Sequence, residues 1–263
     1  MKNNLLITNI KIIASAMLFA LSLNTQASVI FDSGLPAGWN CEGTCGTAGA
    51  DGDVTESSFG GNYGWVATTD GEAGVGLEGI GGTTGSVLTS SLFSAEAGDD
   101  LNFFFNYVTS DGAGFADYGW ARLLDEAFNQ VAILFTARTL ESGNIVPGFG
   151  MPAPEATLSP ATVEIIGGAP TWSPLGGDSG DCYKAGCGYT GWIESNYSIA
   201  NAGNYYLEFG TVNWDDSQYQ SGLAFDGISV GGDVVGEPVD VPEPQTAILF
   251  VLALAGLARK KYS

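Results

Sequence analysis

Glycine is the feature that most constrains the fold of this chain. It accounts for 39 of the 263 residues, and clusters such as Gly79-Ile80-Gly81-Gly82 and Gly231-Gly232 separate short apolar or alternating runs. Short runs between turn signals are typical of strands, and no internal segment keeps the 3.6-residue period of a long helix. The sequence therefore predicts an all-β body of short strands joined by turns.

The strand pattern falls on several separate segments. They are residues 29–32, 64–68, 86–92, 101–108, 120–124, 131–136, 162–166, 205–212 and 223–230. Between two of them, Asp125–Gln130 is expected to turn a hairpin, although Leu123–Phe128 could instead form a helical turn. Residues 141–160 are rich in proline, glycine and alanine and are predicted to be a long loop.

Both ends of the chain are typical of processing segments, which leaves residues 28–236 as one body. Residues 1–27 combine Lys2 and Lys11, an apolar run from Ile12 to Leu23 and a small-residue end at Ala27. That run is short for ~30 Å of hydrocarbon, so a cleaved signal peptide is favoured over an anchor. The expected partners are the Sec translocon and signal peptidase.

The last segment, residues 237–263, carries three elements in order. Pro242, Glu243 and Pro244 precede an apolar stretch from Thr246 to Ala258, and the basic residues Arg259, Lys260 and Lys261 follow. Proline blocks a helix upstream, the apolar stretch can insert in the inner membrane, and the basic end stays cytoplasmic. This order resembles the PEP-CTERM sorting signal of Gram-negative bacteria, which implies an exosortase as partner and surface attachment or release.

The body also resembles an uncharacterised family of PEP-CTERM proteins. The resemblance rests on Pro36–Trp39, Asn106–Phe115, Pro147–Pro154, Gly186–Trp192 and Gly222–Gly227. It implies a shared fold and sorting route and brings no known activity.

The two ends of the body further resemble the first and last strands of jelly-roll domains. These ends are Phe31–Trp39 and Phe225–Val230, and such strands usually lie side by side. The fold class we expect is an antiparallel two-sheet β-sandwich, jelly-roll-like, in a single domain.

Charge and histidine content exclude several functions. All 29 acidic residues lie between Asp32 and Glu243, and that span has only Arg122, Arg138 and Lys184 as basic residues. Such a field repels nucleic acid and anionic polymers and favours divalent cations. Histidine is absent from the chain, which removes the usual triad base and the commonest zinc ligand but leaves carboxylate-based glycosidases.

Four cysteines form two close pairs. In an exported chain we expect disulfides, with local bridges Cys41–Cys45 and Cys182–Cys187 preferred among the three pairings. A four-cysteine zinc site is the alternative, although the spacing is not that of CxxC knuckles.

Structural calcium is the one cofactor that the sequence suggests. Asp51-Gly52-Asp53, Asp178-x2-Asp181 and Asp215-Asp216 place hard oxygen ligands in turns, without a complete EF-hand loop. By resemblance to jelly-roll modules, in which calcium often lies near the terminal strands, Asp32 and Asp226 are the candidate ligands.

Aromatic side chains suggest a carbohydrate-binding role. Trp172, Trp192 and Trp214 lie nearest the predicted loops, where exposed rings could stack on sugars, although burial in the core is the commoner fate of such residues. No local signature selects two catalytic carboxylates from the acidic residues.

We therefore expect a non-enzymatic, exported cell-surface or matrix protein that acts in adhesion or in exopolysaccharide and biofilm association. The alternatives are a secreted carbohydrate-binding module and a carboxylate-based glycan-active enzyme.

Overall fold

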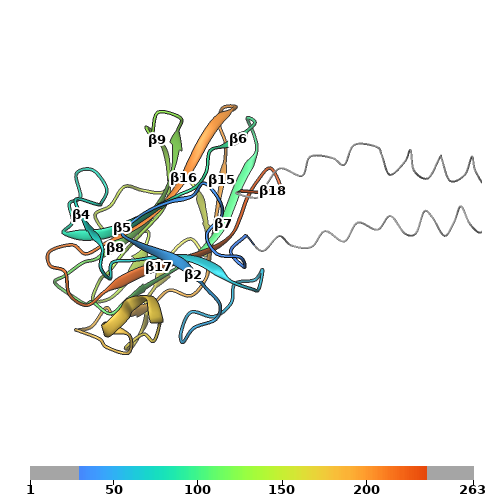
Figure 1. The fold of residues 1–263 in the computed structure, drawn as a ribbon. Helices are drawn as coiled ribbons and strands as arrows, with labels where there is room; N and C mark the ends of the chain where they lie inside the picture. The colour runs from blue at the N-terminus through green and yellow to red at the C-terminus, as the bar shows by residue number, and fades with distance from the viewer. Residues whose placement is uncertain (1–29, 236–263) are drawn as a thin grey trace, which may run out of the picture.

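The computed structural model describes residues 30–235 as two packed antiparallel sheets (Figure 1). The predicted signal peptide and sorting tail lie outside the described residues. Sheet A has the order β1 (Asn40–Glu42), β5 (Thr84–Thr89), β16 (Gly203–Val212), β8 (Tyr118–Asp125) and β9 (Gln130–Arg138). The short strands β4 (Glu72–Ala73) and β6 (Phe93–Ala95) pair with β5 and β16.

Sheet B has the order β11 (Thr157–Ser159), β15 (Ile193–Ser198), β7 (Asp100–Thr109), β17 (Ser221–Val230), β3 (Tyr63–Ala67) and β2 (Thr44–Ala48). Three short strands extend it: β13 (Ile166–Gly167), β14 (Gly188–Tyr189) and β18 (Asp233–Val234). A small separate ribbon pairs β10 (Asn144–Val146) with β12 (Val163–Glu164), and the 3-10 segment η1 (Ser173–Asp178) is the helical element of the described residues.

The strand order is that of a jelly roll. Taken along the chain, the main strands are β3, β5, β7, β8, β9, β15, β16 and β17. Counted one to eight in that sequence, they lie in the orders 6-3-8-1 in sheet B and 2-7-4-5 in sheet A, which is the arrangement of a double Greek key. The first and the last of these strands are neighbours, with Leu223 opposite Val66. The predicted β-sandwich is thus confirmed.

Phenylalanine rings from both sheets form the core between them. Phe105 of β7 stacks on Phe135 of β9 with ring centroids 3.7 Å apart, and Phe209 of β16 stacks on Phe225 of β17 at 3.9 Å. Phe103 meets Phe209 edge to face at 5.2 Å. All five rings are fully buried. Aromatic pairs of this kind add to the free energy gained from burying their area, so these contacts hold the two sheets together.

Most strand predictions are confirmed, and the exceptions have physical reasons. Ile30–Ser33 form a turn and β1 starts only at Asn40, so the predicted opening strand is wrong. Phe31 still packs on Phe225 at 5.7 Å, because a ring can reach the last strand from a turn. Residues 162–166 divide between β12 and β13, and the predicted loop 141–160 contains β10 and β11.

Strand β15 was not predicted, because its buried positions include a polar residue. Ser195 occupies an inward position and satisfies its hydroxyl by donating to the backbone oxygen of Leu134, 3.1 Å away in sheet A. The hairpin between β8 and β9 is confirmed. Its turn is closed by the Asp125 carboxylate, which accepts from the backbone N–H groups of Ala127 and Asn129.

We expect Phe209→Ala to lower the free energy of unfolding by about 3–5 kcal/mol, since it removes the ring that touches both Phe103 and Phe225 and leaves a cavity. Urea unfolding followed by tryptophan fluorescence measures this. Phe149→Ala, at a side chain 71% exposed, is the matched control and should change stability by no more than about 0.5 kcal/mol. A cost for Phe209→Ala below about 1 kcal/mol would contradict the packing described here.

Candidate functional site: a groove on the outer face of sheet A

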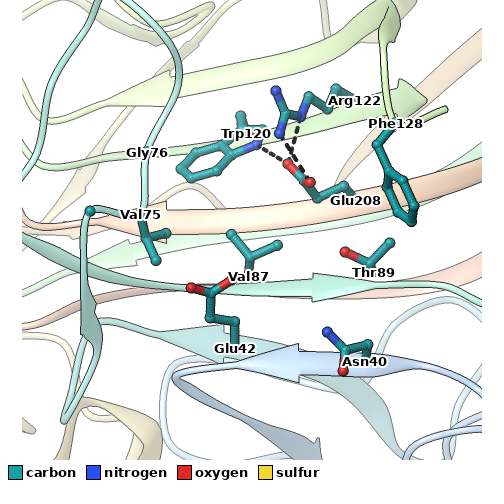
Figure 2. A pocket seen from close by; sticks show the side chains of 11 residues that line it. Asn40, Glu42, Val75, Gly76, Val87, Thr89, Trp120, Arg122, Phe128 and Glu208 are labelled. Carbon is teal, nitrogen blue, oxygen red and sulfur yellow. Dashed lines mark hydrogen bonds and ion pairs between the residues drawn. The ribbon is translucent and has the colours of Figure 1, made fainter. Parts of the chain in front are cut away.

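A groove of about 330 Å³ lies on the outer face of sheet A (Figure 2). Its walls come from β1, β5, β16 and β8, from the turn after β8, and from the loop that follows β4. The side chains inside it are a mixture of polar, charged, apolar and aromatic groups. A site of this composition can hold a ligand that has both hydroxyl groups and apolar faces.

Strand register builds the groove from two cross-strand rows. In the first row Asn40, Thr89, Glu208 and Arg122 lie opposite one another on four neighbouring strands. Side chains alternate between faces along a strand, so residues two positions away share the outer face. The second row is therefore Glu42, Val87, Gly210 and Trp120.

Gly210 leaves room for the floor of the groove. A Cβ atom at this position would lie 2.2 Å from the ring of Trp120, so the indole can lie flat across the strand only because the residue is glycine. The ring is 1% exposed and forms the base beneath the polar residues. A larger residue at 210 would push the indole out of the groove.

Glu208 is held by the ion pair of the groove. Its Oε1 accepts from Arg122 Nε at 2.6 Å and from Trp120 Nε1 at 3.1 Å, and its Oε2 accepts from Arg122 Nη2 at 3.1 Å. Within residues 30–235 no other salt bridge occurs. Bidentate pairing of this kind neutralises a carboxylate that is nearly buried and fixes both side chains.

An exposed aromatic stack stands at one end of the groove. Phe128 is 61% exposed and stacks on Tyr206 with centroids 4.6 Å apart and planes 10° apart. Phe128 has a φ of 62°, a left-handed conformation that the turn imposes. Hydrogen bonds from the Asn129 side chain and from backbone amides to Asp125 lower the pKa of that carboxyl and stabilise the turn.

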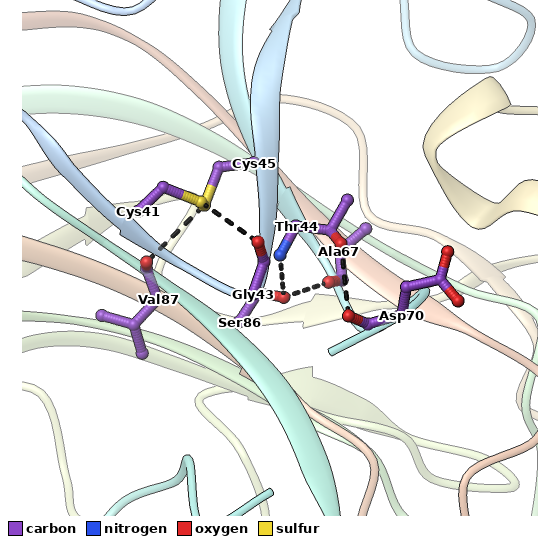
Figure 3. The surroundings of a disulfide bond; sticks show 8 residues. All are labelled: Cys41, Gly43, Thr44, Cys45, Ala67, Asp70, Ser86 and Val87. Atoms are coloured by element: carbon purple, nitrogen blue, oxygen red, sulfur yellow. Dashed lines mark hydrogen bonds between the residues drawn. A yellow bond between two sulfur atoms is a disulfide. The ribbon is translucent and has the colours of Figure 1, made fainter. Parts of the chain in front are cut away.

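The first disulfide positions the strand that carries Asn40 and Glu42. The chain passes from β1 in sheet A to β2 in sheet B at Gly43, and Cys41–Cys45 closes this crossing (Figure 3). Ser86 supports it by accepting from the Thr44 N–H at 2.8 Å and donating to the Ala67 carbonyl at 2.6 Å. The predicted bridges Cys41–Cys45 and Cys182–Cys187 are both confirmed.

None of the three predicted tryptophans lines this groove. Trp172 is fully buried against sheet B and donates to the Tyr63 hydroxyl at 2.9 Å, so the prediction that it stacks on sugars is wrong. Its burial follows from η1, which covers the outer face of that sheet. Trp192 is half-buried and donates to the Thr55 carbonyl, while Trp214 is half-buried beneath the guanidinium of Arg138 at 4.8 Å.

The sequence did carry a signal for the aromatic residues of the groove. Trp120 and Arg122 are two positions apart on a predicted strand and therefore share one face of it. Phe128 lies in a predicted hairpin turn, where a large apolar residue is unusual. What no local pattern showed is that β1 and β16 bring Asn40 and Glu208 to the same row.

The acidic residues expected to bind calcium have varied surroundings. Asp32 is exposed and accepts from the Asn62 N–H, while Asp226 is buried beside the Ser57 hydroxyl. Burial raises the pKa of Asp226, and the negative charge of Asp32 raises it further. Within residues 30–235, no three side chains among His, Cys, Asp and Glu converge as a metal centre.

Asp51 and Asp53 fasten a loop. Asp51 accepts from the Ser173 N–H and Asp53 from the Thr171 N–H, so both hold the segment that leads into η1.

In the part of the chain that the structure describes, no helix is long and apolar enough to cross a bilayer.

No protein-family model matches the chain, and no curated protein matches it in sequence. Solved structures with a related course include the K1 adhesin domain of Lys-gingipain from Porphyromonas gingivalis W83, at 12% identity, a TM-score of 0.38, and coverage of 77% of this chain and 95% of that one. The K3 adhesin domain of the same protein is 14% identical, with a TM-score of 0.37, and the match covers 76% of this chain and 94% of that one. The tailspike protein 4 enzymatically active domain of bacteriophage CBA120 is 12% identical, with a TM-score of 0.33, and the match covers 74% of this chain and 19% of that one.

We expect Arg122→Met to destabilise the protein by about 2–3 kcal/mol, because it leaves the nearly buried carboxylate of Glu208 without its cation. This cost is smaller than that of breaking a fully buried ion pair, since Arg122 is partly exposed. Adding Glu208→Gln to Arg122→Met should restore part of the loss, since glutamine still accepts from Trp120 and carries no charge. Denaturant unfolding of both single variants and the double variant measures the coupling. Strictly additive losses would contradict the pairing.

Proposed function

We propose that this chain is an exported, non-enzymatic protein of the cell surface or extracellular matrix, and that the groove on sheet A binds a neutral polysaccharide. The observation that carries the proposal is the groove itself, in which the polar side chains of Asn40, Glu42 and Thr89 lie beside an exposed aromatic stack. Adhesion or biofilm association through exopolysaccharide would follow from such binding.

The chemistry of the groove suits sugars. A sugar ring offers hydroxyl groups at its edge and C–H groups on its faces. Asn40, Glu42 and Thr89 supply acceptors and donors for hydroxyls, while Val75 and Phe128 supply apolar contact. The surrounding negative charge disfavours anionic polymers, so neutral chains fit best.

The covalent features of the chain fit export. Two disulfides are expected to persist in an oxidising compartment outside the cytoplasm. Both ends of the described part lie at one end of the sandwich, beside β18 (Figure 1). A tail leaving from that end, processed by an exosortase after transient insertion in the inner membrane, would keep the groove on the side of the body accessible.

The alternative of a glycan-active enzyme has one observation in its favour, because Glu42 and Glu208 line the same groove. A glycosidase needs one carboxyl that donates a proton and another that acts as base or nucleophile. Both oxygens of Glu208 are instead occupied by Arg122 and Trp120, which is the environment of a fixed anion. This favours binding over hydrolysis.

We expect Phe128→Ala to weaken binding of the host's exopolysaccharide, or of a neutral glucan, by about three- to tenfold, as expected for loss of one aromatic contact. Affinity electrophoresis and titration calorimetry measure this. Phe149→Ala is the matched control, since Phe149 is also exposed but lies outside the groove. Equal affinity of the Phe128→Ala variant and the wild type would refute the proposed site, and release of reducing sugar that stops with Glu42→Gln would establish the enzyme instead.

We expect intact mass analysis of the protein from its native host to find a species that starts at Ser28 and ends between Val241 and Pro244. Reduction should add about 4 Da, because each of the two disulfides takes up two hydrogens. A full-length tail found in the membrane fraction would make the C-terminus a simple anchor and would contradict processing by an exosortase.

A further inference from the structure

Buried polar side chains gather at the end of the sandwich opposite the described chain ends. Strands β7 and β17 pair Leu101 with Val230 near those ends and Thr109 with Ser221 at the other. From this far end, the loop after β7 carries Asp111 and Asp117, and the loop before β17 carries residues 213–220. The groove of sheet A includes none of these residues.

Asp117 is at the centre of this group. It is 1% exposed; its Oδ1 accepts from the Trp214 N–H at 3.0 Å and its Oδ2 lies 2.7 Å from the Ser221 hydroxyl. The Ser221 hydroxyl also lies 2.7 Å from the hydroxyl of Thr109. These contacts fix the carboxylate but bring no positive charge.

The Asp111 N–H donates to Thr109 Oγ1 at 3.1 Å, and Asn213 directly precedes Trp214, so both residues adjoin this network. Each has a side-chain oxygen with no hydrogen-bond donor among residues 30–235. Asp111 is 1% exposed; its Oδ1 accepts from the Gly112 N–H at 2.6 Å, whereas its Oδ2 has no donor. Asn213 is fully buried; its amide nitrogen donates to Thr84 Oγ1 at 3.1 Å, and its Oδ1 has no donor. Buried acceptors are normally satisfied, because leaving one unpaired costs about 1–3 kcal/mol.

The charges around these oxygens are of one sign. The negative charge of Asp111 raises the pKa of Asp117, and the negative charge of Asp216 raises the pKa of both. Burial raises the pKa of Asp111 to about 7 and that of Asp117 well above its usual range.

The nearby cations are engaged elsewhere. Arg138 donates to the Ala116 carbonyl and lies over Trp214, and Lys184 lies over Tyr183 at 4.8 Å.

We propose that Asp111 Oδ2 and Asn213 Oδ1, with Asp117 beside them, bind a hard divalent cation of the calcium class. Calcium accepts carboxylate, amide and backbone oxygens together, so it does not require three acidic side chains. Two carboxylates and one amide oxygen are a modest ligand set, which places the dissociation constant in the 10⁻⁴–10⁻³ M range, about that of extracellular calcium modules. The bound ion would join the β7–β8 loop to the β16–β17 loop.

This site is distinct from the pair that the sequence suggested. Asp226 pairs with Phe104 near the middle of β7, whereas Asp111 follows the end of that strand. Asp32→Asn is therefore a matched control, because it also replaces an acidic residue by its amide and tests the other location.

The experiment titrates calcium chloride into chelator-treated full-length protein by calorimetry and measures the melting temperature with calcium, magnesium or chelator. We expect one calcium per chain, and at about 10 mM calcium a rise in melting temperature of roughly 3–10 °C. Asp111→Asn and Asn213→Ala should lose both effects, and Asp32→Asn should keep them.

Three results would overturn the proposal. The first is wild-type protein that neither binds calcium at about 10 mM nor melts higher in its presence. The second is loss of the calcium effect in Asp32→Asn but not in Asp111→Asn. The third is an Asp111→Asn variant that is more stable than wild type in chelator while calcium leaves wild type unchanged, since a proton on Asp111 would then take the place of the metal ion. If the variants do not fold, the wild-type titration alone decides.

Discussion

The contact between phenylalanine rings of opposite sheets is the interaction on which the rest of the structure depends. Phe105 with Phe135 and Phe209 with Phe225 join strands that are far apart in sequence and belong to different sheets. Because side chains alternate along a strand, each inward ring fixes which residues point outward. With Phe209 in the core, Glu208 and Gly210 must face the other side, and the groove on sheet A follows from that alternation.

The two outer faces then have different fates. On sheet B, η1 and Trp172 cover the outer surface, with Val54, Tyr63 and Val108 packed beneath them. On sheet A, Val75 and Leu77 of the loop after β4 cover the end near Tyr118 and leave the rows that start at Asn40 and Glu42 open. A sandwich with one face covered in this way presents a single broad sheet surface to a polymer, which fits the binding role proposed for the groove.

The large excess of acidic residues makes it costly in free energy to bury a carboxylate in this protein. With 29 acidic and 8 basic residues, most carboxylates have no cation available and remain at the surface. Glu208 is buried with Arg122, whereas Asp111 and Asp117 are buried with none. A buried carboxylate needs a positive partner, a proton or a metal ion. The pair in the groove and the proposed cation at the far end are two answers to this requirement.

The sequence by itself determined the elements that depend on near neighbours. Glycine spacing and alternation located β7, β9, β16 and β17, and the close cysteine pairs led to the correct disulfides, since a bridge four or five residues long depends on local geometry. The predictions for the signal peptide and sorting tail also rest on sequence alone. Tertiary structure decided the rest. It buried Trp172, folded the opening segment into a turn in place of a strand, and brought Asn40, Thr89, Arg122 and Glu208 into one row. Register between strands distant in sequence is set by core packing over the whole sandwich, and no local pattern contains it.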